Sequence, residues 1–398
     1  MTSASRGSRR GEVDPFIVMD VMERARAAEA AGRRIVHMEV GQPGTPAPDG
    51  ARRALAQALE RPLGYTVALG LPKLRAGIAA LYQRWYGVDL DPARVIVTTG
   101  SSGAFLLAFT ALFDAGDRVA LGEPGYPSYR QILRALSLTP VGVQSRAENR
   151  LQPTPEDLAG IDAKGLIVAS PGNPSGTMLS RDALAALIHW AEARGTAFIS
   201  DEIYHGLHYG DRAVSALEIS QQPWVINSFS KYFSMTGWRV GWMVVPEDQI
   251  RRVERLAQNF FICPPHASQI AALAALDCIP ELEANRAVYA ENRRLMLEGL
   301  PKAGFSKIAP PDGAFYIYAD VSDLTQDSLA LAAEILDGAG VAVTPGLDFD
   351  PIRGAQTLRF SYAGATADIA EGLVRLQDYM GRREHGAKVN GLWPGRAG

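Results

Sequence analysis

A lysine set among serines and aromatic residues is the first residue of this sequence whose type and setting could do chemistry. The neighbours of Lys231 are Ser228, Phe229, Ser230, Tyr232 and Phe233. Partial burial in such a setting lowers the pKa of a lysine, so its neutral amine can act as a nucleophile near neutral pH. Because an isolated lysine is usually a solvated surface residue, this interpretation depends on the groups that accompany it.

A carboxylate follows another apolar segment. Asp201 comes directly after residues 197–200, at the point where a parallel strand would leave a sheet. Open parallel sheets bind ligands at the carboxyl ends of their strands, so Asp201 is expected to point into a cleft. The alternative is that Asp201 caps a helix beginning at Glu202. Tyr204 either shares that cleft or packs against the core.

A third polar junction could hold an anion. Residues 98–103 follow the apolar segment 94–97 and precede a predicted helix. Backbone N–H groups and the hydroxyls of Ser101 and Ser102 could cradle a phosphate there, with a plain tight turn as an equal alternative. Arg239 could add a planar fork of donors. The segment has neither the Gly-Lys-Ser/Thr ending of a P-loop nor the glycine spacing of a dinucleotide-binding loop.

One cofactor accounts for these features together. Pyridoxal 5′-phosphate requires a lysine that bonds to its aldehyde carbon, an anion cradle for its phosphate and a carboxylate beside its ring nitrogen. Lys231 supplies the amine, the Ser101–Ser102 loop with Arg239 supplies the cradle, and Asp201 supplies the carboxylate. The combination therefore predicts a pyridoxal-phosphate site.

The elements that must position these groups alternate along the chain. The predicted strands are 35–40, 94–97, 117–121, 165–169, 197–200, 224–227 and 240–245, and the predicted helices are 20–32, 104–113 and 181–194. Continuous apolar strands separated by helices indicate an α/β fold, with a large domain whose mostly parallel sheet is covered by helices on both faces.

The pattern changes after about Pro280. A long polar helix over 282–298 is followed by strands at 315–318 and 357–361 with a helix at 328–336 between them, which indicates a smaller α+β domain. We expect residues 1–45 to form an N-terminal arm and part of this small domain, 46–282 the large domain and 283–398 the C-terminal small domain. About 15 residues at each end are expected to be loosely held.

Composition excludes several classes of protein. The 398 residues carry a formal net charge of −3, so the chain lacks the excess of basic residues that is typical of nucleic-acid-binding proteins. The apolar segment 104–113 is about half as long as a membrane span. Two cysteines, Cys263 and Cys278, are too few for a zinc site or a disulfide framework. We therefore expect a cytoplasmic protein with no metal, no nucleic-acid partner and no membrane partner.

Seven motifs occur in the order in which one enzyme family carries them. They are Val-Gly-Gln-Pro at 40–43; Gly-Tyr-Thr at 64–66 with Gly-Leu-Pro-Lys-Leu-Arg at 70–75; Glu-Pro-Gly-Tyr-Pro at 123–127; Ser-Pro-Gly-Asn-Pro-Ser-Gly at 170–176; Asp-Glu-Ile-Tyr at 201–204; Ser-Phe-Ser-Lys at 228–231 with Thr-Gly-Trp-Arg-Val-Gly at 236–241; and Leu-Arg-Phe-Ser at 358–361. On these motifs the chain resembles, over nearly its whole length, the class I/II aminotransferases, which are pyridoxal-phosphate enzymes of fold type I.

The resemblance implies roles around the cofactor ring. Lys231 would carry the cofactor covalently and move a proton between the substrate Cα and the cofactor. Asp201 would keep the ring nitrogen protonated. Asn173 and Tyr204 would hydrogen-bond the phenolic oxygen of the ring, and Tyr126 would stack on its face.

The resemblance also implies how the phosphate is held. The backbone amides of Ser101 and Ser102 would bind it, together with the side chains of Ser228 and Arg239. Tyr65 would reach the phosphate of the neighbouring subunit, so the resemblance implies a homodimer whose active sites are shared.

A third set of implied roles concerns the substrate. Arg359 would clamp the α-carboxylate of an amino acid, helped by Asn173 and by the amide of Gly41. No arginine matches the one that some relatives use for a distal carboxylate. Four residues could line an apolar pocket for the substrate side chain, or could serve only for packing: Phe16, Ile17, Tyr126 and Phe261.

The function implied is amino transfer between an amino acid and a 2-oxo acid by a ping-pong mechanism, within amino acid biosynthesis. The same carbanion chemistry at Lys231 would serve a β-lyase acting on cysteine conjugates, which is the main alternative. A non-catalytic effector-sensing module of the same fold is a remote one, since no helix-turn-helix pattern precedes Gly41.

Overall fold

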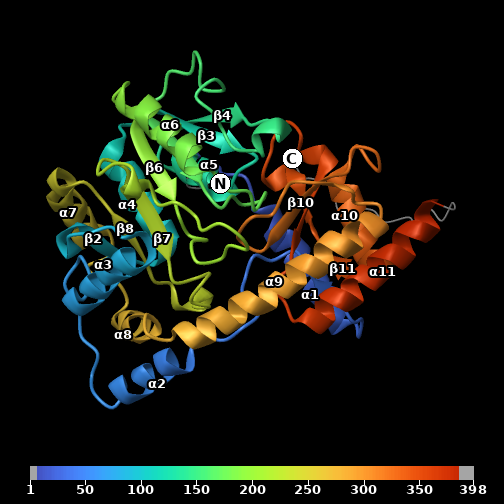
Figure 1. Cartoon of the computed structure of the whole chain (residues 1–398), viewed down its shortest axis with the longest axis horizontal. Coiled ribbons are helices and arrows are strands. Elements are labelled where there is room, and N and C mark those ends of the chain that lie inside the picture. Colours follow the sequence, from blue (N-terminus) through green and yellow to red (C-terminus); the bar gives the residue numbers. More distant parts are fainter. Residues whose placement is uncertain (1–6, 385–398) are drawn as a thin grey trace, which may run out of the picture.

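The structure is a computed structural model that describes residues 7–384, and Figure 1 shows its two unequal parts. Most of the tail segments predicted to be loose lie outside the described residues. Among the described residues of the N-terminal tail, Arg9–Gly11 forms a 3-10 turn.

A seven-stranded sheet forms the larger part, in the order β2-β8-β7-β6-β5-β3-β4. Its strands are β2 Val95–Thr98, β3 Arg118–Glu123, β4 Thr139–Gln144, β5 Gly165–Ala169, β6 Ala197–Asp201, β7 Trp224–Ser228 and β8 Gly241–Val244. The β3–β4, β3–β5, β5–β6 and β6–β7 pairs are parallel, whereas β8 runs antiparallel to both of its neighbours. The predicted mostly parallel sheet is therefore confirmed.

Both faces of this sheet are buried, as the unbroken apolar strands predicted. Neighbouring residues of β5 belong to different cores: Ile167 faces one, whereas Leu166 and Val168 face the other. The first core includes residues of α4 Gly100–Leu112, α5 Pro127–Ala135 and α7 Ile250–Phe260. The second includes residues of α3 Pro72–Tyr86, α6 Arg181–Glu192 and α8 His266–Ala275.

Strand β4 was not predicted from the sequence. It lies at the edge of the sheet and pairs only with β3. Its residues are mostly half-buried or exposed, and Pro140 lies within it. An edge strand of this kind lacks the continuous apolar signal of the buried strands, which is why the pattern did not reveal it.

The smaller part contains a four-stranded antiparallel sheet in the order β12-β13-β10-β9. Its strands are β9 Lys307–Ile308, β10 Tyr316–Asp320, β12 Thr344–Pro345 and β13 Thr357–Ser361. A parallel pair, β1 Val36–His37 with β11 Val341–Ala342, joins the N-terminal segment to this part. The strand predicted over 35–40 is thus limited to the two residues that have a partner.

The remaining helices are α1 Ile17–Ala30, α2 Asp49–Ala58, α9 Ile279–Lys302, α10 Ser328–Ala339 and α11 Thr366–Glu384. Helix α2 packs against α8 of the larger part, whereas the other four complete the smaller part and connect it to the larger. Figure 1 shows α9 running along the molecule from α8 toward α11. Helix α9 spans residue 282 without a break. The predicted domain boundaries at residues 45 and 282 stay predictions. Over residues 7–384, no helix is long and apolar enough to cross a membrane.

Candidate active site

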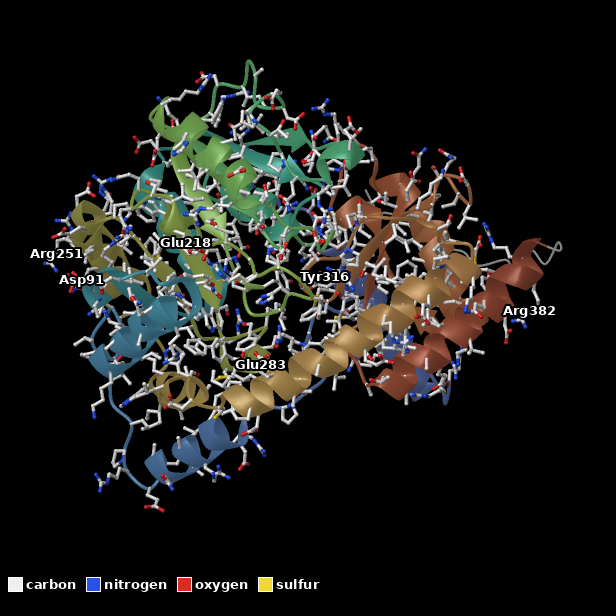
Figure 2. The ribbon with its side chains drawn as sticks, in the orientation of Figure 1. Asp91, Glu218, Arg251, Glu283, Tyr316 and Arg382 are labelled. Carbon is white, nitrogen blue, oxygen red and sulfur yellow. The ribbon has the colours of Figure 1, made fainter. Side chains whose placement is uncertain are left out.

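A cavity of about 210 Å³ lies at the carboxyl ends of β5 and β6, between the two parts of the molecule. Figure 2 shows Tyr316, which lines the cavity, at the junction of these parts. Ten of the predicted site residues line it: Gly41, Ser101, Ser102, Tyr126, Asn173, Asp201, Tyr204, Lys231, Arg239 and Arg359. The predicted location of the site at the strand ends therefore agrees with the structure.

Lys231 follows β7 in a turn whose neighbours are buried. Its Nζ donates a hydrogen bond to the carbonyl oxygen of Gly41 over 2.6 Å. The pKa of Lys231 is lowered to about 7, chiefly by burial and also by the guanidinium groups of Arg359 and Arg239, whereas the Asp201 carboxylate opposes this shift. The amine can therefore hold or release a proton near neutral pH. Gly41 contacts this amine through its carbonyl group, whereas its predicted role used the amide.

Asp201 is the last residue of β6 and is buried. Its carboxylate accepts hydrogen bonds from the hydroxyl of Tyr129 and from the backbone N–H of Ile203, the latter over 3.1 Å. Burial raises the pKa of Asp201 to about 6, against the effect of both hydrogen bonds and of Lys231. Turns rather than a helix follow Asp201, so the alternative of a helix cap at this position is wrong.

The anion cradle is the first turn of α4. This helix begins at Gly100, four residues before the predicted start, so Ser101 and Ser102 lie at its N-terminus. A Cβ on Gly100 would lie 2.5 Å from Nη2 of Arg239, so a side chain there would push this guanidinium away from the helix end, and the φ of +71° also favours glycine. Arg239 Nη1 also donates to the carbonyl oxygen of Thr236 over 2.9 Å. The helix N-terminus and the guanidinium together favour a bound anion.

Ser228 lies beneath the cavity rather than on its wall. Its hydroxyl donates to Ser230 Oγ over 2.9 Å and to the carbonyl oxygen of Val240 over 3.2 Å. Ser230 and Thr236 line the cavity instead. Contact of Ser228 with a phosphate stays a prediction, and Ser230 and Thr236 are hydroxyl donors that the sequence analysis missed.

Arg359 projects from β13 and is only 2% exposed. Its Nη1 donates to Asn173 Oδ1 over 2.9 Å, and its Nη2 donates to the carbonyl oxygen of Glu39. The guanidinium lies between the rings of Tyr316 and Phe349, with its central carbon 4.4 and 4.7 Å from their centroids. Among the residues that the structure describes, buried Nε of Arg359 has no hydrogen-bond partner.

Three tyrosines complete the wall, two of which the sequence analysis did not identify. The hydroxyls of Tyr204 and Tyr316 are 2.7 Å apart, and Tyr129 donates to Asp201. Tyr129 lies three residues after Tyr126 on α5, so the spacing of one helical turn could have indicated it. Tyr316 gave no such signal, because it lies in an apolar strand, 75 residues after the end of the motif at 236–241.

Besides Ser228, three predicted residues do not line the cavity. Tyr65 is 84% exposed, on the loop between α2 and α3. Phe261 packs against the core that contains α4 and α7. Of the other residues predicted for a side-chain pocket, Phe16 and Tyr126 line the cavity, whereas Ile17 does not.

Comparison with known proteins agrees with this geometry. Residues 33–376 match the family model for aminotransferase class I and II. A valine–pyruvate aminotransferase of Mycobacterium tuberculosis is 49% identical in an alignment of 378 residues, which covers 93% of this chain and 97% of the relative.

Solved structures give the same result. A Silicibacter pomeroyi protein, named only provisionally as an aminotransferase, is 70% identical with a TM-score of 0.92, covering 95% of this chain and 100% of that one. The aspartate aminotransferase of Thermus thermophilus, solved with maleate, is 31% identical with a TM-score of 0.89, covering 94% and 100%. This chain belongs to the class I and II aminotransferases, enzymes that transfer amino groups.

Proposed function

We propose that this enzyme uses pyridoxal 5′-phosphate, bound covalently at Lys231, to move an amino group from an amino acid to a 2-oxo acid. The observation that carries the proposal is the convergence of three groups on one cavity: the amine of Lys231, the carboxylate of Asp201 and the anion cradle at Gly100–Ser102. When bound, the cofactor supplies an aldehyde for the amino group and a ring that accepts the electron pair left at Cα.

The residues present fit that cofactor. A Cβ at the Gly100 position would displace Arg239 from the helix end, where the two would hold a phosphate together. Burial of Asp201 disfavours its charged form. Lys231 is the charged group that lowers its pKa, so a cationic ring nitrogen beside Asp201 would stabilise the carboxylate further. Asn173, Tyr204 and Tyr126 line the same cavity and are available to the ring.

Lys231 is the proposed catalyst of proton transfer. Its pKa of about 7 means that Nζ can take a proton from the substrate Cα and return it with little cost. The hydrogen bond to the carbonyl oxygen of Gly41 holds the amine beside the N-terminal segment of the chain when no cofactor is attached. Asp201 would keep the ring nitrogen protonated through this step.

Arg359 is the proposed anchor of the substrate. Its guanidinium is fixed by Asn173, Glu39 and two flanking rings, and Nε remains free to donate to a carboxylate. A preorganised guanidinium of this kind orients the α-carboxylate and so places Cα toward Lys231. The 2-oxo acid has the same carboxylate, so one anchor serves both halves of a ping-pong cycle.

An amino donor with an apolar side chain is favoured. The cationic residues on the cavity wall in the described part of the chain are Lys231, Arg239 and Arg359, and each has a proposed role already. Phe16, Met19 and Met22 of the α1 region provide apolar surface. The name of the Mycobacterium tuberculosis relative, a valine–pyruvate aminotransferase, supports the same class of donor.

A homodimer is proposed for the active enzyme. Apolar side chains are exposed on two neighbouring loops, at Tyr65, Val67 and Ile262. These loops contact one another, since Thr66 N–H donates to Cys263 Sγ over 3.4 Å. A second copy covering this face would bring its Tyr65 to the neighbouring cofactor phosphate. The cytoplasmic location and the biosynthetic role stay predictions.

A single-turnover experiment tests the proposed reaction. The cofactor-loaded enzyme is mixed with valine, leucine, alanine or aspartate, without a 2-oxo acid, while the visible absorption of the cofactor is followed. We expect conversion to the amine form of the cofactor and release of one 2-oxo acid, fastest with an apolar donor. Formation of pyruvate and ammonia from a cysteine conjugate, without conversion of the cofactor, would instead support the β-lyase alternative.

A further inference from the structure

The N-terminus of α1 is capped by a residue from the other end of the chain. The carboxylate of Asp348 accepts the backbone N–H of Ile17 through Oδ1 over 2.9 Å and that of Val18 through Oδ2 over 2.8 Å. Phe16, at the usual capping position of this helix, supplies no side-chain hydrogen bond. Asp348 is 5% exposed, so this cap lies inside the protein. A helix end leaves its first N–H groups without partners, and Asp348 satisfies two of them.

This end of α1 forms one wall of the active-site cavity. Phe16, Val18, Met19 and Met22 all line the cavity, and all four side chains are apolar. The ring of Phe16 meets that of Tyr126 edge-on, with centroids 6.0 Å apart. Because these side chains belong to the first turns of α1 or precede it directly, their position follows that of the helix end.

The turn that carries Asp348 is tied to the rest of the site. Asp348 ends the 3-10 turn Gly346–Asp348, which follows β12. The next residue, Phe349, lies against the guanidinium of Arg359, and its carbonyl oxygen accepts the N–H of Gly125, the residue before Tyr126. A Cβ on Gly346 would lie 1.8 Å from Thr357 Oγ1, so this turn is packed closely against β13. Asp348 therefore links α1 to the same support that holds Arg359.

We propose that Asp348 is a positioning residue that sets the preference of this enzyme for the side chain of its amino donor. By fixing the first turn of α1, it holds the wall formed by Phe16, Met19 and Met22 at the depth that suits large aliphatic or aromatic side chains. Methionine side chains are flexible and polarisable, so such a wall accepts apolar groups of several shapes. The inference rests on the proposed function, since the donor must occupy this cavity.

The test compares two donors on the cofactor-loaded enzyme. Single-turnover specificity constants are measured for leucine and alanine with the wild-type enzyme, Asp348→Asn and Asp348→Ala. We expect the leucine-to-alanine ratio to fall about tenfold in both variants, the loss of roughly one charge-assisted hydrogen bond. Alanine should react within about twofold of wild type, because its methyl group offers the least surface to the wall.

A second readout does not use activity. Hydrogen exchange of the Ile17 and Val18 amides should be faster in both Asp348 variants, with or without cofactor. The matched control is Asp20→Asn, which removes one carboxylate from the same first turn of α1 but leaves the cap in place. This control should change neither the exchange of those amides nor the ratio of the two donors.

Three results would overturn the proposal. Unchanged exchange in the Asp348 variants would show that the cap does not hold α1. Faster exchange with an unchanged ratio would show that the position of α1 does not set the preference. An equal loss with leucine and alanine would reduce Asp348 to a structural residue. None of these results affects the proposed function, which is judged on the wild-type enzyme and fails if none of the four donors tested above converts its cofactor.

Discussion

Arg359 combines a fixed position with a donor that is still free. Two of its nitrogens are held by Asn173 and Glu39, two rings enclose it, and buried Nε has no partner among the described residues. Leaving a buried guanidinium nitrogen unpaired is costly, and a substrate carboxylate would remove that cost.

Substitution of this arginine should separate substrate binding from cofactor binding. Arg359→Ala is expected to raise KM for the amino acid about 100-fold, which corresponds to about 2.7 kcal/mol, while leaving the affinity for the cofactor within a few fold. Arg359→Lys keeps the charge but not the planar fork, so it should recover only part of the loss. Steady-state kinetics and equilibrium dialysis measure both quantities; an unchanged KM would place Arg359 outside the substrate site.

Asp201 is expected to act on the rate of proton abstraction rather than on attachment of the cofactor. Asp201→Asn removes the charge that keeps the ring nitrogen protonated, so the single-turnover rate should fall at least about 100-fold. The cofactor should still bond to Lys231. Tyr129→Phe is the matched control, because it removes one hydrogen bond to Asp201 and keeps the carboxylate, and its rate should fall far less. Equal rates in Asp201→Asn and wild type would contradict the role.

The sequence identified most of the residues on the cavity wall because their chemistry is tied to short motifs at strand ends. Ten of them were predicted from such motifs. Tyr316 and Ser230 were missed, since an aromatic residue or a serine within an apolar or turn segment has no sequence signal that distinguishes a cavity wall from packing. Tyr129 was missed although its spacing from Tyr126 could have indicated it. Their roles depend on contacts between distant segments, such as that of Tyr316 with Tyr204.

Helix α4 shows how an element and a site depend on each other. Its first turn contains Gly100, Ser101 and Ser102, which have low helix propensity, and the helix was therefore predicted to begin only at Ala104. The same small residues allow the backbone to approach an anion and Arg239. The small residues at 100–102 therefore led to a predicted helix start that was too late, and they also indicated the anion site.

A glycine substitution tests this element directly. Gly100→Ala places a Cβ 2.5 Å from Arg239 Nη2, at a φ of +71°, so cofactor affinity should fall at least about tenfold through loss of one or more charge-assisted bonds. Gly116→Ala is the matched control, since its φ of +93° carries comparable backbone strain but its Cβ would meet nothing within 4 Å. Thermal denaturation should show similar destabilisation of both variants. Equal cofactor affinity in the two would refute the cradle.

The docking of α1 should depend on pH. Burial raises the pKa of Asp348 to about 6, the hydrogen bonds from Ile17 and Val18 and the charge of Arg359 oppose that effect, and Asp20 adds to it. The hydrogen bonds from Ile17 and Val18 lower this pKa, so they favour the ionised carboxylate. Protonation as the pH falls through about 6 converts one accepting oxygen into a hydroxyl and weakens these two bonds, while it relieves the separate cost of burying the charge. The leucine-to-alanine ratio of the wild-type enzyme should therefore fall below pH 6. The ratio in Asp348→Asn should stay flat, and a parallel decline there would assign the titration to another group.

The whole molecule places its cavity between a large sheet and a smaller one. The sequence predicted both parts because the large sheet is buried on both faces and the small one alternates. It could not predict that β8 runs antiparallel or that β1 pairs with β11, because both pairings join segments whose apolar patterns do not encode direction or distant partners.

Sharing of active sites between two subunits can be tested by complementation. Tyr65→Ala and Lys231→Ala enzymes are each expected to have little activity. In a mixed dimer, one site would combine the intact Lys231 of one subunit with the intact Tyr65 of the other, so mixing should restore up to about one quarter of wild-type activity if subunits reassort at random. In the mixed dimer itself, purified through two different tags, one of the two sites is intact, so about one half of wild-type activity is expected. No recovery in a verified mixed dimer would show that Tyr65 does not act across an interface.

The central claim is that the amine of Lys231 carries pyridoxal 5′-phosphate. Borohydride reduction of the purified, cofactor-loaded enzyme, followed by peptide mass spectrometry, tests it most directly. We predict loss of the visible absorption band and one added phosphopyridoxyl group on Lys231, with none on Lys73 or Lys164 and none in Lys231→Ala. A label on another lysine, or an enzyme that turns over normally without any label, would contradict the account.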